Sequence, residues 1–202
     1  MKTQKQKTLE LVQLAMLVAL VVVLQILSAM LPTIPGGVSI TLTLVPVVIG
    51  GILFGKKGGF VLGLSFGIIV IITCATGLDE GAVILWNKNA LFTSIICLVK
   101  GIAAGFFPAC FYELTVGKNT KISSKRKFVA TLIAALSAPI INTMLYLVGM
   151  WILFNDLASG VGSNFIAYAL VVFATANFAV EFIVNIVLTP AIIKIVDVVK
   201  RR

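Results

Sequence analysis

The sequence predicts an all-α integral membrane protein with six transmembrane helices and both termini in the cytoplasm. Of the 202 residues, 60% are hydrophobic and only 11% are charged, a balance that is typical of membrane proteins and not of soluble domains. The apolar residues form six segments that together predict six crossings of a bilayer. No hydrophilic stretch is large enough for a soluble domain, so residues 1–202 are expected to form a single membrane domain.

The positions of lysine and arginine predict the orientation of the chain. Fourteen of the 16 lysine and arginine residues lie in four stretches: the tail 1–8, a turn at 55–58, a loop at 113–127 and the chain end 194–202. Cytoplasmic loops retain Lys and Arg, so these stretches are assigned to the inside. The opposite loops carry Asp79, Glu80 and Asp156, with Lys88 as their one clear cation. The net charge of +9 is therefore a topology signal, and no nucleic-acid partner is needed to explain it.

Six spans follow from the lengths of the apolar segments. They are expected at about 9–31, 40–54, 59–75, 88–112, 128–154 and 165–196. The first is too long for a signal-peptide core and lacks a convincing cleavage site, so it is expected to be retained. The second is short and contains Pro46, which predicts a tilted, kinked or partly re-entrant segment. Pro139 is expected to break the fifth span near its middle.

The first outer connection, residues 31–39 (LPTIPGGVS), contains two prolines and two glycines. Such a composition predicts a loop with a shape of its own. We expect Pro32, Pro35, Gly36 and Gly37 to belong to a gating loop that lies over a pocket and is held by few contacts.

Two sets of small residues predict close helix packing. One set recurs every fourth residue before and along the third span: Gly55, Gly59, Gly63 and Gly67. This spacing places them on one helix face, and small faces let helix backbones approach closely in lipid. Tight packing is the favoured interpretation, and a sliding or gating surface is the alternative. The other set, Ala15 and Ala19, lies near the inner end of the first span and is a candidate docking face for another membrane protein.

Two ionisable residues are expected near the middle of the membrane. Lys100 lies midway along the fourth span and Glu181 midway along the sixth. Charged groups at that depth are costly, so each is a candidate functional residue. Two interpretations remain open: the two groups neutralise each other, or one or both face a water-accessible pocket and contact a polar ligand.

Polar side chains also recur at every fourth residue of the last span: Asn177, Glu181, Asn185 and Thr189. A stripe of this kind is costly against lipid, so it is expected to face protein or a cavity. Together with polar and aromatic groups on other spans, these residues give the candidate substrate-binding set: Lys100, Asn142, Tyr146, Asn177, Glu181, Asn185, Thr93, Trp86 and Trp151. The alternative is that the stripes only hydrogen-bond between helices and that the tryptophans anchor the chain at the membrane interface.

Several classes of protein are excluded by what the sequence lacks. The chain has no histidine, which removes the commonest general base and metal ligand. The three cysteines lie in or beside apolar segments with a spacing that suits neither a disulfide framework nor a zinc site. No P-loop is present, so the chain cannot drive transport with ATP by itself. We therefore expect no enzymatic activity, no cofactor and no metal site.

The order of these features resembles a known family. Ala-x-x-x-Ala in the first span, the turn Gly-Gly-Ile-Leu-Phe-Gly-Lys-Lys-Gly-Gly at 50–59 and the final helix Glu-Phe-Ile-Val-Asn-Ile-Val-Leu-Thr-Pro-Ala at 181–191 resemble the substrate-binding S component of energy-coupling factor (ECF) transporters. The similarity covers nearly the whole chain. Relatives often have Gly-Pro-Lys at the turn, whereas Lys56 takes the place of the proline here.

The resemblance implies a function. S components capture vitamins, or in some cases metal ions, at the outer face of the membrane. They then dock on a scaffold (T) component that carries two cytoplasmic ABC-type ATPases, and they are thought to topple in the membrane to deliver the ligand. The Ala-x-x-x-Ala face, here Ala15 and Ala19, is the implied contact with the scaffold. Metal-specific members use N-terminal histidines, so the resemblance implies an organic substrate for this chain.

The expected function is therefore vitamin capture for ATP-driven uptake across the plasma membrane of a bacterium. Lys100 suits a ligand carboxylate, as in pantothenate, biotin or a folate, and two tryptophans suit a ring such as that of riboflavin; pantothenate is weakly favoured. Two alternatives are a stand-alone small-solute permease and a membrane assembly protein without a ligand.

Overall fold

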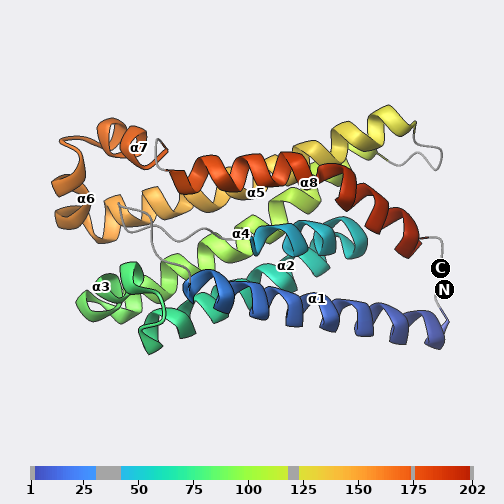
Figure 1. The fold of residues 1–202 in the computed structure, drawn as a ribbon, viewed down its shortest axis with the longest axis horizontal. Helices are drawn as coiled ribbons and strands as arrows, with labels where there is room; N and C mark the ends of the chain where they lie inside the picture. Colours follow the sequence, from blue (N-terminus) through green and yellow to red (C-terminus); the bar gives the residue numbers. More distant parts are fainter. Residues whose placement is uncertain (1–2, 31–41, 118–122, 174–175, 201–202) are drawn as a thin grey trace.

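The computed structural model describes residues 3–30, 42–117, 123–173 and 176–200, and within these ranges the regular structure is helical. The chain forms a bundle of roughly parallel and antiparallel helices with short helices gathered at one end (Figure 1). In chain order the helices are α1 (Gln4–Met30), α2 (Leu44–Thr76), α3 (Glu80–Lys88), α4 (Ala90–Val116), α5 (Ser124–Leu153), α6 (Asn155–Val161), α7 (Phe165–Phe173) and α8 (Ala176–Lys200).

Five of these helices are long and apolar enough to cross a membrane: α1, α2, α4, α5 and the 178–199 part of α8. This confirms an all-α multi-pass membrane protein. The count differs from six because the second and third expected spans form the two arms of α2, and the first arm is short. The start of α1 and the end of α8 lie at the same end of the bundle (Figure 1), an arrangement that suits termini on one side of the membrane.

The chain reverses direction inside α2 at Gly55. This residue has φ 68° and ψ −161°, a backbone conformation that residues with a Cβ rarely adopt. The arm before it, Leu44 to Phe54, is about 16 Å long at 1.5 Å per residue, about half the thickness of a hydrocarbon core. Its residues Leu44, Val47 and Val48 are fully buried. The expectation of a short, partly re-entrant second segment fits this arm, whereas the placement of Gly55 on a helix face was wrong.

Helices α2 and α4 pack with their backbones in contact. A Cβ atom built on Gly105 would lie 2.0 Å from the carbonyl oxygen of Gly59, and one built on Gly63 would lie 2.4 Å from that of Gly101. Gly67 similarly lies against the backbone at Cys97. The predicted small-residue face is therefore a packing face, because glycine is the residue that admits such an approach.

Three other expectations about the helices need correction. Pro139 lies inside a continuous α5 and does not break it, since neighbouring helices can hold a transmembrane helix together around a proline. The sixth expected span corresponds to α7 and α8, and α8 continues past residue 196 to Lys200; residues 174–175 lie outside the described ranges. The outer connections that follow Thr76 and Leu153 contain short helices, α3 and α6.

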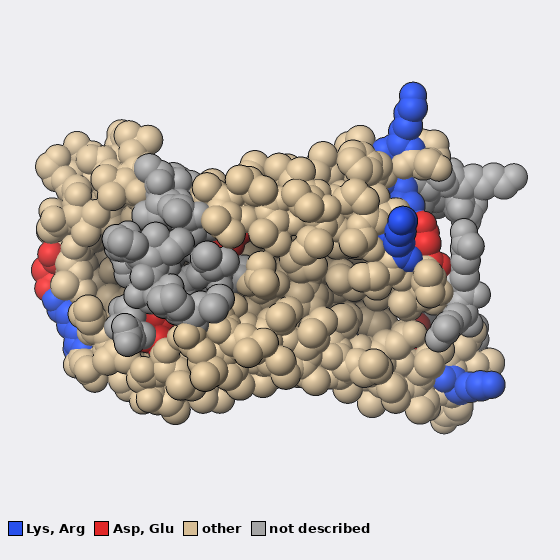
Figure 2. Space-filling view, viewed as in Figure 1, with Lys and Arg blue, Asp and Glu red and all other residues tan. Residues whose placement is uncertain are grey.

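The charged residues are segregated along the bundle. Figure 2 shows most of the visible lysine and arginine side chains at the end where α1 begins and α8 finishes, with an almost uncharged middle. At this end, Lys56 of the α2 turn lies 3.5 Å from Glu113 of α4, and Lys127 of α5 pairs with Asp197 of α8. The described parts of the four basic stretches thus lie at one end of the fold, as their alternation predicts.

The contact between α2 and α4 can be tested with single methyl groups. Gly105→Ala should lower the thermal stability of the purified protein clearly, because overpacking of a close contact costs about 1–3 kcal/mol. Gly160→Ala in α6 is the matched control, since a Cβ there meets no heavy atom within 4 Å. Equal melting temperatures for the two variants would contradict the close packing of α2 on α4.

Candidate functional site

The relative depth of the polar residues follows from how α5 and α8 are paired. The two helices run antiparallel and side by side (Figure 1), and the ion pair Lys127–Asp197 ties the start of α5 to the end of α8. Counting from this pair at 1.5 Å per residue, Asn142 lies about 22 Å along α5, while Asn185 and Glu181 lie about 18 Å and 24 Å along α8. These three side chains therefore lie at nearly the same depth on two contacting helices.

Helix α4 places Lys100 close in depth to Asn142, Asn185 and Glu181. The ammonium nitrogen of Lys100 lies 5.3 Å from the centre of the Tyr146 ring on α5, within the range of a cation–π contact. Phe92 of α4 and Phe154, the residue that follows α5, also meet edge to face, with ring centres 6.1 Å apart. Tyr146 is one helical turn beyond Asn142, farther from the end that carries the termini. Residues of α4, α5 and α8 thus form one polar layer: Lys100, Tyr146, Asn142, Glu181 and Asn185.

The predicted stripe on α8 faces the protein interior. Glu181, Asn185 and Thr189 are exposed by 2%, 1% and 0%, so the expectation that the stripe avoids lipid is confirmed for these three. Their hydrogen bonds run along the helix itself. The amide nitrogen of Asn185 donates to the carbonyl oxygen of Glu181 at 2.8 Å, and the hydroxyl of Thr189 donates to that of Asn185 at 2.8 Å. The side chain of Asn177 lies outside the described residues.

Two buried amide oxygens in this layer accept no hydrogen bond within the described part of the chain. They are the Oδ1 atoms of Asn142 and Asn185. A buried acceptor without a donor costs about 1–3 kcal/mol, and such groups in native proteins are few. The two oxygens lie at nearly the same depth on contacting helices. A bound molecule that donates from O–H or N–H groups would satisfy both of them.

The structure bears on the two interpretations of Lys100 and Glu181. Among the described residues, the ion pairs are Lys56–Glu113, Lys88–Asp156 and Lys127–Asp197. Lys100 therefore does not pair with Glu181 there, and its recorded neighbour is the face of Tyr146.

The remaining candidate residues are packed in different places. Thr93 is buried, and its hydroxyl donates to the carbonyl oxygen of Asn89 on its own helix. Trp86 of α3 packs against the main apolar core, whereas Trp151 of α5 contacts the rings of Phe165 and Tyr168. The expected gating-loop residues Pro32, Pro35, Gly36 and Gly37 lie outside the described residues. Ala15 and Ala19 are exposed on α1.

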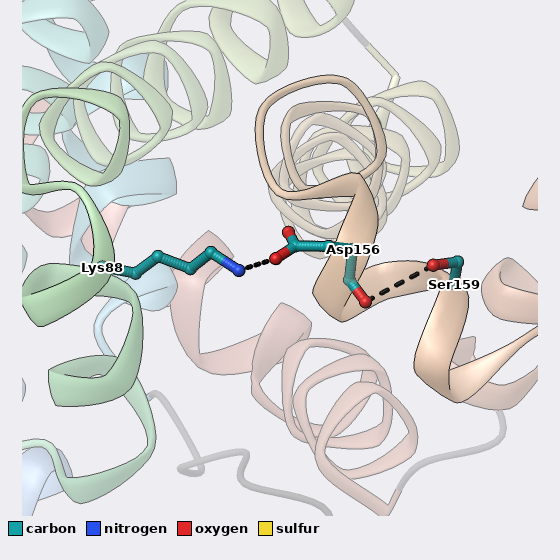
Figure 3. Close-up of polar contacts among 3 residues, drawn as sticks. All are labelled: Lys88, Asp156 and Ser159. Atoms are coloured by element: carbon teal, nitrogen blue, oxygen red, sulfur yellow. Dashed lines mark hydrogen bonds and ion pairs between the residues drawn. The ribbon is translucent and has the colours of Figure 1, made fainter.

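A contact between the short helices α3 and α6 was not foreseen from the sequence. Lys88, at the end of α3, forms an ion pair with Asp156, at the start of α6 (Figure 3). Leu85 of α3 packs against the apolar cluster that Phe154 and Tyr168 form beneath α6. The signal in the sequence was that Lys88 is the one clear cation among the acidic outer loops, but the sequence does not say which carboxylate it meets.

Apolar helices around a buried polar layer define an all-α integral membrane protein with polar side chains in its interior. Comparison with known proteins identifies the family within this broad class. The family model described as "ECF transporter, substrate-specific component" matches residues 9–193. The chain belongs to this family, and it is a transport component, not an enzyme.

One curated relative also covers the chain. It is the pantothenic acid transporter PanT of Lactococcus lactis subsp. cremoris (strain MG1363), which is 28% identical over 195 residues and covers 94% of both chains. No solved structure matches this chain.

The contact between α3 and α6 is suited to a double-mutant cycle. Lys88→Met and Asp156→Asn should show a coupling energy of about 0.2–1 kcal/mol in thermal or denaturant unfolding, because both side chains are partly exposed. The coupling should shrink as salt is raised.

The control for this cycle combines Lys88→Met with Asp197→Asn, whose partner is Lys127 at the other end of the bundle. The effects of these two changes on the free energy of unfolding should be additive. A coupling between Lys88 and Asp156 as small as that of the control would show that the pair does not hold α3 and α6 together.

Proposed function

We propose that this chain is the substrate-capture (S) subunit of an ECF-type ABC importer and that its substrate is pantothenate. In this proposal the ligand binds from the outer face of a bacterial plasma membrane, in the polar layer between α4, α5 and α8. The observation that carries the proposal is the pair of buried amide oxygens on α5 and α8 that have no donor within the described residues, together with a half-buried lysine on α4, in a chain of the substrate-specific family.

The chemistry of the layer supports pantothenate over the other vitamins considered. Pantothenate has one carboxylate, one amide and two hydroxyl groups on an aliphatic chain. Lys100 supplies one cation, and Asn142 and Asn185 supply amide groups. The two tryptophans, which would favour a large flat ring, pack in two different apolar clusters and not against each other; the cluster of Trp151 also includes Tyr146. The name of the Lactococcus relative points to the same vitamin.

The second part of the proposal is that the chain docks on a T component. An S subunit of this kind needs a scaffold T component and two ABC-type ATPases for uptake. Ala15 and Ala19 are exposed on α1, toward the end where the basic stretches meet. Small exposed side chains at helix spacing allow another helix to approach closely, so this face is the proposed contact with the T component.

Ligand binding tests the central part of the proposal. The purified chain should bind radiolabelled pantothenate, and an excess of unlabelled pantothenate should displace it while riboflavin and biotin should not. Displacement by riboflavin or biotin, with no effect of pantothenate, would replace the proposed substrate. Binding of none of the three would contradict a vitamin-capture function and favour the alternative of a ligand-free assembly protein.

Docking is tested by bulky substitutions on α1. Ala15→Leu combined with Ala19→Leu should abolish pantothenate uptake by the full complex in proteoliposomes, while binding by the isolated chain stays unchanged. Ala191→Leu on α8 is the control, because Ala191 is also exposed and lies toward the same end of the bundle. Normal uptake by the α1 double variant would exclude this face as the docking surface.

A further inference from the structure

We infer that the site holds its ligand in one direction, with the carboxylate at the level of Lys100 and the hydroxyl groups deeper, against the amide oxygens of Asn142 and Asn185. This inference rests on the proposed function and adds the orientation of the substrate. Recognition then involves two levels of the bundle. Lys100 at one level binds the charged carboxylate, and Asn142 and Asn185 at the other accept hydrogen bonds from the ligand.

The depth of each group fixes the direction. Along α5, Tyr146 lies about 28 Å from Lys127 and Asn142 about 22 Å, at 1.5 Å per residue. Lys100 is at the level of Tyr146, because its ammonium group lies 5.3 Å from that ring. On α8, Asn185 lies about 18 Å from the Lys127–Asp197 pair. The cation is thus nearest the end with α3 and α6, and the two acceptors, which lie at nearly the same depth, are both deeper.

The two ends of the layer also differ in chemistry. A lysine ammonium group has hydrogen-bond donors and no acceptor, so it suits a carboxylate. The orientation of the Asn185 amide is set by its own helix, because its Nδ2 atom donates to the carbonyl oxygen of Glu181. Its Oδ1 atom is consequently left as a buried acceptor, as is Oδ1 of Asn142. Ligand hydroxyl or amide protons satisfy such oxygens, whereas a carboxylate would be repelled.

The length of pantothenate fits the separation of the levels. The level of Lys100 and the level of Asn185 are about 10 Å apart along the bundle by the same count. The backbone of pantothenate has as many atoms as about three extended residues, which span about 10 Å. One molecule can therefore reach from the ammonium group to the deeper oxygens.

The test compares pantothenate with pantothenol, in which the carboxylate is replaced by an uncharged alcohol. Kd values for both compounds are measured with the full chain and with Lys100→Met, Asn142→Leu and Asn185→Leu. Thr189→Val is the matched control, because Thr189 is buried one turn from Asn185 but its hydroxyl bonds to its own helix.

Lys100→Met should weaken pantothenate binding by about 10- to 150-fold, the scale of one hydrogen bond to a charged group, and should leave pantothenol binding within about 3-fold. Each Asn→Leu change should weaken both compounds by a similar factor and leave their affinity ratio unchanged. The ligand-free melting temperature of the Asn→Leu variants should not fall, because a buried acceptor without a donor is removed. Thr189→Val should alter neither affinity.

Other results would overturn the inference in distinguishable ways. Equal losses for pantothenate and pantothenol in Lys100→Met would show that Lys100 does not read the carboxylate. Full affinity in both Asn→Leu variants would show that water and not the ligand satisfies the amide oxygens. If the unsubstituted chain binds pantothenate, either of these results overturns only the orientation, and the proposed function stands. If the unsubstituted chain binds no pantothenate, both the proposed function and the orientation are overturned.

Discussion

The contact between the backbones of α2 and α4 is the constraint on which the rest of the structure depends. Where Gly59, Gly63 and Gly67 meet Gly101, Gly105 and the backbone at Cys97, no side chain separates the two helices. In a bilayer, where lipid tails are as apolar as leucine, close packing of this kind supplies much of the attraction between helices. It fixes α4 against the long arm of α2, and α4 in turn presents Lys100 to Tyr146 on α5.

The packed helices enclose polar side chains in the interior of the bundle. Glu181, Asn185 and Thr189 are almost completely buried, so α8 places a polar face against its neighbours and an apolar face toward lipid. Asn185 and Thr189 use their donors on the backbone of their own helix. Amide acceptors are left at one depth in the interior. Buried acceptors without a donor are costly, and under the proposed function a polar ligand that donates to them would recover that cost as binding energy.

Local patterns in the sequence predicted most of the elements but not all of their ends. Hydropathy located every long helix, since a run of apolar residues has few alternatives to a buried or lipid-facing helix. The pattern predicted the turn at 55–58, which Gly55 makes, but it also placed Gly55 on the helix face of Gly59, Gly63 and Gly67, because glycine at a four-residue spacing is compatible with both a helix face and a turn with positive φ. Pro139 was expected to break α5, yet tertiary contacts keep that helix continuous. The Lys88–Asp156 contact joins residues far apart in the chain, and no local pattern encodes it.

The sequence by itself determined the class of protein, the positions of the apolar helices and the grouping of the basic stretches at one end. Hydropathy and charge are properties of single residues summed over short segments, so they can be read without a fold. The tertiary structure decided which candidate residues share a level. Lys100 of α4 lies over the Tyr146 ring of α5, and Asn142 of α5 and Asn185 of α8 lie at similar depths, because the helices are held in a particular register, while Trp86 and Trp151 pack in two different apolar clusters. Register depends on contacts between distant segments, such as Lys127 with Asp197 and Gly63 with Gly101, and the periodicity of one helix carries no information about its partner.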